Sequence, residues 1–167
     1  TNFSAVCVKT TNLDPIAVTV IMVALDVVAA LVGVVFGGMM RWFRLSVKYF
    51  APIFFLLGYL CFATSPSLPS LLVGCLFIGI ANGIGVPYLN TIASIKAGQD
   101  AATTVMPLLS AALYAGQFLS PLVATPLAAK FFPDNLSGIY WIACAFSILF
   151  LLEAFATRRF QSLPPKE

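Results

Sequence analysis

Apolar residues run along the chain in long stretches, which short polar or proline-containing breaks separate. A helix that crosses a hydrocarbon core about 30 Å thick needs roughly 20 residues, and five stretches approach or exceed that length. They cover residues 16–40, 49–64, 69–93, 101–129 and 138–157. None shows the strict apolar and polar alternation of an outer-membrane barrel strand. Because only helices and closed barrels span a bilayer, the pattern predicts an all-α polytopic helical membrane protein.

The composition excludes several classes of protein. Hydrophobic residues make up 60% of the 167 residues and charged residues 9%, with a mean hydropathy of +1.00, whereas a soluble domain carries about 25% charged residues. The chain has no His, which removes the commonest metal ligand and general base. It also lacks paired intramembrane carboxylates, so we expect no enzyme, cofactor, metal site or nucleic-acid partner. The four cysteines show no metal spacing and are expected to pack as small apolar residues: Cys7, Cys61, Cys75 and Cys144.

Basic residues are unequally divided between the two predicted sides of the membrane. One side has Arg41, Arg44, Lys48, Lys96, Arg158, Arg159 and Lys166, and the other has only Lys9 and Lys130. The positive-inside rule therefore predicts a cytoplasmic tail at 158–167 and an extracytoplasmic segment at 1–15. We expect the cell membrane as the location. The chain begins at Thr1 without an initiator Met, and we expect it to be truncated there.

The predicted helices differ in the size of their side chains. Segments 49–64 and 138–157 are bulky all round, which favours contact with lipid. The other three segments carry small and polar residues, which favour contact with protein or a cavity. Small residues four apart predict faces where helices cross closely, either for tight packing or for a moving interface: Gly33 and Gly37, Gly79 and Gly83, and Ala112, Gly116 and Ser120.

Asp26 stands near the middle of segment 16–40. An ionised carboxylate costs at least about 2.5 kcal/mol in the bilayer centre, so it should be neutral, paired or facing water. A proton-coupling carboxylate must load and release a proton, and Asp26 is our candidate for that role. The alternative is a protonated Asp hydrogen-bonded to a neighbouring helix. Glu153 lies near the end of the last segment, where an interfacial ion pair with Arg158 or Arg159 is expected.

Amides, phenols and prolines gather on segments 69–93 and 101–129. The amides and phenols could line a substrate path or bond between helices, and the sequence leaves both roles open: Asn82, Tyr88, Asn90, Tyr114 and Gln117. Each interior proline deletes a backbone hydrogen bond and favours a bend. The expected bending positions are Pro87, Gly116 and Pro121, with further prolines at Pro107 and Pro126. Bent helices near the midplane are typical of transporters, although proline is common in membrane helices generally.

Three motifs resemble the major facilitator superfamily of transporters. Residues 37–44 have the sequence GGMMRWFR and are followed by Lys48, similar to the basic cytoplasmic loop between the second and third helix of each half. Residues 79–87, GIANGIGVP, resemble the tenth helix of that family. Residues 116–121, GQFLSP, resemble its eleventh helix and its antiporter motif, with Ser120 in place of a glycine. Arg41 stands where the N-terminal half normally has an acid, so the resemblance implies helices eight to twelve.

The resemblance implies a partial six-helix half of a transporter that works by alternating access. It implies a gating latch at Gly37, Arg41, Arg44 and Lys48, although this loop could serve topology alone. The expected activity is proton-coupled efflux of a small drug or metabolite. The expected partners are the lipid bilayer, the solute, the proton and the missing N-terminal half of the transporter. The alternative is a non-transporting scaffold or accessory subunit that acts through helix contacts.

Overall fold

A computed structural model describes residues 14–43, 46–65, 67–133, 135 and 137–157. All regular secondary structure in these residues is helical, which confirms the all-α prediction. The helices are α2 (Pro15–Phe43), α3 (Val47–Thr64), α4 (Leu68–Phe131) and α5 (Gly138–Ala156). The predicted tail at 158–167, most of the predicted segment 1–15, and Arg44 lie outside the described residues.

Five helical segments are long and apolar enough to cross a membrane: Pro15–Phe43, Val47–Thr64, Leu68–Gly98, Thr103–Phe131 and Gly138–Ala156. The chain is therefore a multi-pass integral membrane protein. The largest difference from the predicted ranges is at the end of the third span, predicted at residue 93 and observed at Gly98. Helical turns continue there because the polar residues beyond 93 still form backbone hydrogen bonds.

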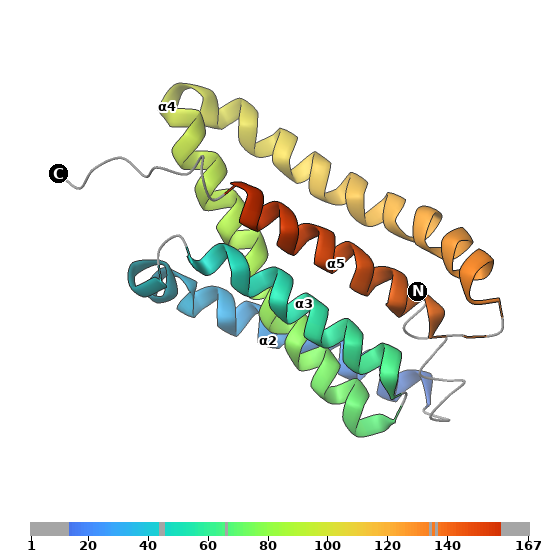
Figure 1. Cartoon of the computed structure of the whole chain (residues 1–167). Coiled ribbons are helices and arrows are strands. Elements are labelled where there is room, and N and C mark those ends of the chain that lie inside the picture. Colours follow the sequence, from blue (N-terminus) through green and yellow to red (C-terminus); the bar gives the residue numbers. More distant parts are fainter. Residues whose placement is uncertain (1–13, 44–45, 66, 134, 136, 158–167) are drawn as a thin grey trace.

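The two spans of α4 meet at a sharp turn of the chain (Figure 1). Gly98 has φ 70° and ψ 177°, and it is the residue inside α4 that departs from helical angles. Such angles are essentially restricted to glycine, since a side chain would be strained there. We call residues Leu68–Gly98 the first arm and Thr103–Phe131 the second arm of α4.

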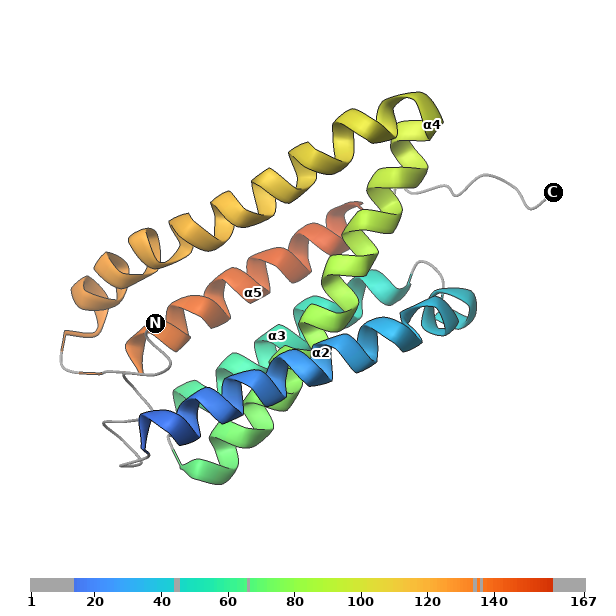
Figure 2. The same ribbon diagram turned by 180° about the vertical axis from the view of Figure 1, so that it is seen from behind.

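The first arm crosses α2, as Figure 2 shows from behind. The crossing lies at two glycines of the first arm. A methyl group at Gly79 would lie 2.9 Å from the carbonyl oxygen of Leu25, and one at Gly83 would collide with that of Ala29. The backbones approach this closely only because both positions lack a side chain. The predicted close-crossing pair Gly79 and Gly83 therefore lies on a real helix interface.

The first arm also packs against α3 through a second pair of glycines. A methyl group added to Gly58 would lie 3.0 Å from the Gly74 carbonyl oxygen, and the reverse distance is also 3.0 Å. The hydroxyl of Ser70 donates a hydrogen bond of 2.8 Å to the carbonyl of Cys61 across the same interface. Such a bond is favourable between helices that have no water nearby. The α3 helix is thereby held in the centre of the bundle, with α5 on its other side (Figure 1).

The second arm is the least covered part of the bundle. Its most apolar stretch has no buried residue, and the corresponding stretch of α2 is 6% buried, against 33% for α3. The expectation that the small and polar segments face protein holds for the first arm, which is 44% buried, but not for α2 or the second arm. Segment 49–64, which was expected to face lipid, is instead more buried than either of those two spans. The reason is that Gly58 has no side chain, so the backbone of α3 can pack closely against the first arm although the residues around Gly58 are bulky. Asp26 of α2 and the polar residues of the second arm are exposed, whereas the small residues Ala29 and Gly33 of α2 lie against the first arm.

Candidate functional site

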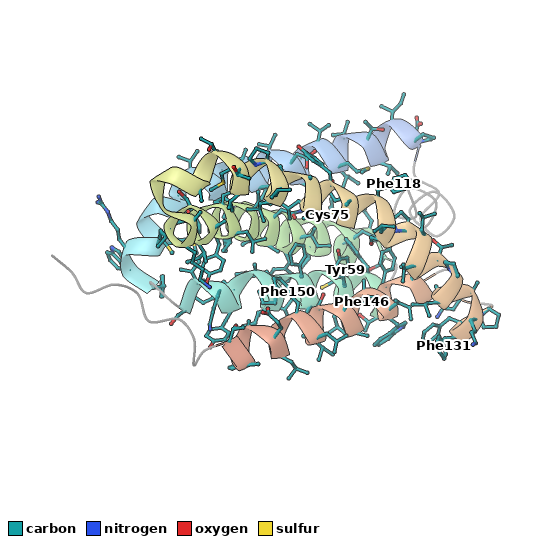
Figure 3. The ribbon with its side chains drawn as sticks, turned by 90° about the horizontal axis from the view of Figure 1, so that it is seen from above. Tyr59, Cys75, Phe118, Phe131, Phe146 and Phe150 are labelled. Carbon is teal, nitrogen blue, oxygen red and sulfur yellow. The ribbon has the colours of Figure 1, made fainter. Side chains whose placement is uncertain are left out.

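A cavity of about 200 Å³ lies between α2, α3, α4 and α5, beside Asp26. We call it the Asp26 cavity. Each helix contributes to its lining, and the residues are Met22, Leu25, Asp26, Tyr59, Phe62, Cys75, Ile78 and Tyr140. Tyr59 and Cys75 lie near each other in the middle of the bundle in Figure 3. The cavity is thus a convergence point for residues far apart in the chain.

The glycine crossings explain why these residues converge. The contact between Gly58 and Gly74 brings Tyr59 and Phe62 of α3 beside the start of the first arm. The contact of Gly79 with the Leu25 carbonyl brings the next residue, Asp26, to the same region. The backbone packing that the sequence encodes with small residues therefore positions the carboxyl group.

Aromatic packing closes the cavity on the α5 side. The rings of Phe62 and Tyr140 have their centroids 5.1 Å apart at an interplanar angle of 55°. Tyr140 is 6% exposed and belongs to a buried cluster with Phe62, Leu71, Cys75 and Ile78. Aromatic pairs at this separation add to the hydrophobic packing. This wall therefore gives the cavity a fixed apolar boundary.

The polar groups of the lining are few, and Asp26 is its single carboxyl group. Two phenols, Tyr59 and Tyr140, and the thiol of Cys75 complete the set. Asp26 itself is exposed at the surface of the chain, whereas Tyr59 is half-buried and Cys75 is buried. The carboxyl group therefore stands between a largely apolar cavity and a face that this chain does not cover.

The size of the cavity limits what it can hold. Liquid water takes about 30 Å³ per molecule, so 200 Å³ corresponds to about six waters beside the carboxyl group. Pockets for drug-sized ligands measure about 300–1,000 Å³. The Asp26 cavity is thus suited to a proton and its waters, and a larger solute needs additional walls.

The predicted substrate-path residues do not line this cavity. Asn82 is half-buried on the first arm and Asn90 is exposed. Tyr88 lines a different cavity at the opposite end of the bundle. Tyr114 is 69% exposed on the second arm, and Gln117 is exposed on the same arm. Within this chain, the five residues therefore do not form one site.

The predicted latch residues do not lie together in one site either. Gly37 and Arg41 lie within α2, which continues to Phe43, and Arg41 is exposed in its last turn. A cation there interacts favourably with the negative end of the helix dipole. Lys48 is instead buried in the first turn of α3, with its ammonium nitrogen 5.0 Å from the centroid of the Tyr49 ring.

The predicted bending positions keep helical backbone angles. Pro87, Gly116 and Pro121 lie inside α4, where the non-helical angles are those of Gly98. At Pro87 the hydroxyl of Thr91 donates a hydrogen bond of 2.8 Å to the proline carbonyl. The helix continues through Pro87 and Pro121, and the sharp reversal of the chain takes place at Gly98.

Sequence reasoning missed the phenols that share the cavity with Asp26. Tyr59 and Tyr140 belong to the two bulky segments that were expected to face lipid. Their one signal was position, because Tyr59 stands near the C-terminal end of α3 and Tyr140 near the N-terminal end of α5. In the described part of the chain, no group of three or more acidic, Cys or His side chains is placed to hold a metal ion.

No family model, no curated protein and no solved structure matches this chain. The function is therefore inferred from the residues of the chain and from the way the helices bring them together.

Proposed function

We propose that this chain is part of a secondary transporter, related to the C-terminal half of the major facilitator superfamily. In this proposal Asp26 carries the coupling proton. The observation that carries the proposal is that Asp26 lines a cavity of about 200 Å³ between the helices of a membrane bundle. The solute is a small uncharged or cationic molecule, exported in exchange for protons.

The environment of Asp26 supports proton binding. A carboxylate within a membrane span is expensive unless it meets water, a partner or a proton. Its neighbours across the cavity are phenols and a thiol, and the described residues include no ion pair with Asp26. Protonation removes the charge without requiring a second ion. Water in the cavity would provide a route for the proton to enter and leave.

The uncovered faces support a larger assembly. Phe118 is 71% exposed and Leu108 is 64% exposed on the second arm, and α2 is similarly uncovered. Both helices also carry polar groups on these surfaces, including Asp26 and Gln117. Polar intramembrane side chains normally face a bundle interior or a water-filled cavity. A second set of helices against α2 and the second arm would create that interior and the walls of a solute site.

Rocking of two helical halves would then expose the central site to either side. Arg41, exposed at the end of α2, would contact acids or helix C-termini of the other half in one of the two states. Arg44 would belong to the same latch. Gly37 has no neighbouring atom within 4 Å of an added methyl group, which leaves room for such contacts.

The test is a transport assay on the full-length protein that contains this chain. Everted membrane vesicles are energised with a proton gradient, and accumulation of ethidium, a cationic probe, is followed by fluorescence. Asp26→Asn should abolish gradient-driven accumulation while expression stays normal. Asp14→Asn is the matched control, because Asp14 caps the start of α2 by accepting the backbone N–H of Ile16 at 3.2 Å, and an Asn oxygen keeps that role.

The two results have distinct meanings. Uphill transport that persists in Asp26→Asn would remove the carboxyl group from the coupling role. A full-length protein that moves neither ethidium nor any of a panel of uncharged and cationic solutes would favour the scaffold or accessory subunit. A measurement of the intact mass of the natural polypeptide comes first, because a two-half transporter should exceed twice 17.9 kDa.

A further inference from the structure

A second cavity, of about 210 Å³, lies at the other end of the bundle between α3, the first arm of α4, and α5. We call it the lysine cavity. Its charged residues are Lys48, Lys96 and Glu153, and its lining also includes Tyr88, Phe150 and Thr157. It shares no residue with the Asp26 cavity. Ligand binding at the lysine cavity would not depend on the proposed transport function.

Lys48 is the unusual member of this group. Its residue is 7% exposed, and lysine is rarely buried without a partner. In the part of the chain that the structure describes, no carboxylate oxygen lies within 4.0 Å of its ammonium group. The Tyr49 ring at 5.0 Å offers an attractive face but no negative charge. The side chain of Lys48 is packed among the helices, while its residue also lines the cavity, so the ammonium group can take a counter-ion from the cavity.

The charge of the cavity defines that counter-ion. Lys48 and Lys96 contribute two positive charges and Glu153 contributes one negative charge. One further negative charge makes the cavity neutral. A phosphodiester carries one negative charge and offers two unesterified acceptor oxygens, one for each ammonium group.

The position of the charged residues fits the headgroup region of a bilayer. Lys48 is in the first turn of α3, Lys96 is in the last turn of the first arm, and Glu153 is in the last turn of α5. All three helix ends therefore meet at one membrane surface. Phe150, Leu89 and Ile92 line the cavity further along the helices, toward the hydrocarbon core. The cavity thus has a charged mouth and an apolar floor, as a lipid requires.

We propose that the lysine cavity binds the phosphate group of an anionic phospholipid, held between Lys48 and Lys96. Basic pockets between helix ends bind such headgroups in other membrane proteins. The volume of 210 Å³ corresponds to about seven waters, which is enough for a phosphate group and part of its ester linkages. Glu153 then limits the site to ligands of low negative charge.

The test uses the full-length protein in nanodiscs that contain phosphatidylglycerol and phosphatidylcholine. After transfer to detergent, native mass spectrometry counts the phosphatidylglycerol that stays bound. Lys48→Gln and Lys96→Gln should each lower retention about 10-fold, as expected when one charge-assisted hydrogen bond is lost. Lys130→Gln is the control, because Lys130 is an exposed lysine in the last turn of the second arm, away from the cavity.

Glu153→Gln distinguishes lost lipid binding from a folding defect. It removes the negative charge that repels the phosphate group and keeps both lysines. Retention of phosphatidylglycerol should rise several-fold in this variant. Equal retention in the wild type, Lys48→Gln and Lys96→Gln proteins would overturn the proposal. A second assay adds inorganic phosphate at millimolar concentration. If phosphate displaces the lipid, and if this displacement depends on both lysines, free phosphate is the ligand and the proposal of a lipid is overturned.

Discussion

Gly83 of α4 lies so close to the carbonyl oxygen of Ala29 in α2 that a single methyl group would not fit between the two helices. The same missing methyl group would also press against the side chain of Val32. This contact holds α2 against the first arm, and it lies one helical turn beyond the contact that positions Asp26. The stability of the bundle and the geometry of the candidate site therefore depend on the same crossing.

Gly83→Ala should destabilise the bundle, because the obstructing atom is a backbone carbonyl that cannot rotate away. Overpacking of this kind costs about 1–3 kcal/mol. Thermal unfolding of the purified protein in detergent, followed by size-exclusion chromatography, measures the loss. Gly38→Ala is the control, because a methyl group at Gly38 of α2 meets nothing within 4 Å. Equal melting temperatures for the two variants would contradict the observed crossing.

Gly74→Ala tests the crossing between α3 and the first arm of α4. A second substitution, at Phe62, should partly restore the stability that Gly74→Ala removes. The added methyl group would collide with the ring of Phe62 and would lie 3.0 Å from the carbonyl oxygen of Gly58. Phe62→Leu removes the ring collision but leaves the backbone contact. The double variant should therefore be more stable than the sum of the two single losses predicts. Strict additivity of the three melting measurements would show that Phe62 and Gly74 are not coupled.

The arrangement of the spans could largely be predicted from the sequence, since hydropathy alone locates runs of the required length. Gly79 and Gly83 were also recognisable, because small residues four apart mark a face that a helix can approach. The same spacing at Gly33 and Gly37 was less informative. A methyl group added to Gly33 would lie 3.8 Å from the Gly83 carbonyl oxygen, and one added to Gly37 would meet nothing within 4 Å. Spacing identifies a surface that permits close contact, but the partner helix decides whether contact occurs.

The candidate site was predictable only in part. Asp26 was evident as the one acidic residue near a span centre, but Tyr59 and Tyr140 were not. Helices α3 and α5 are apolar on all sides, so periodicity cannot show which face turns inward. Their rotation is decided by distant contacts such as Gly58 with Gly74. Lys48 was likewise expected in a loop and lies buried in a helix, because α3 begins before it, at Val47.

Gly98→Ala should destabilise the turn between the two arms of α4. A methyl group there meets nothing within 4 Å, so the effect comes from the backbone angles and not from packing. A non-glycine residue in this region costs about 1–3 kcal/mol. Gly116→Ala is the control, because Gly116 has helical angles and equal free space. The melting temperature should fall for Gly98→Ala only, and a fall of similar size in both variants would refute the assignment.

The orientation predicted from the basic residues can be tested at two serines that stand at opposite ends of α3. Ser46 precedes α3, Ser67 precedes α4, and both are exposed. In a variant of the full-length protein whose own cysteines are replaced, Ser67→Cys should react in intact cells with a membrane-impermeant maleimide. Ser46→Cys should react only after the membrane is opened, because the positive-inside rule places the α2–α3 connection in the cytoplasm. The reverse pattern would invert the topology, and it would move the lysine cavity to the outer membrane surface, where fewer anionic lipids are available.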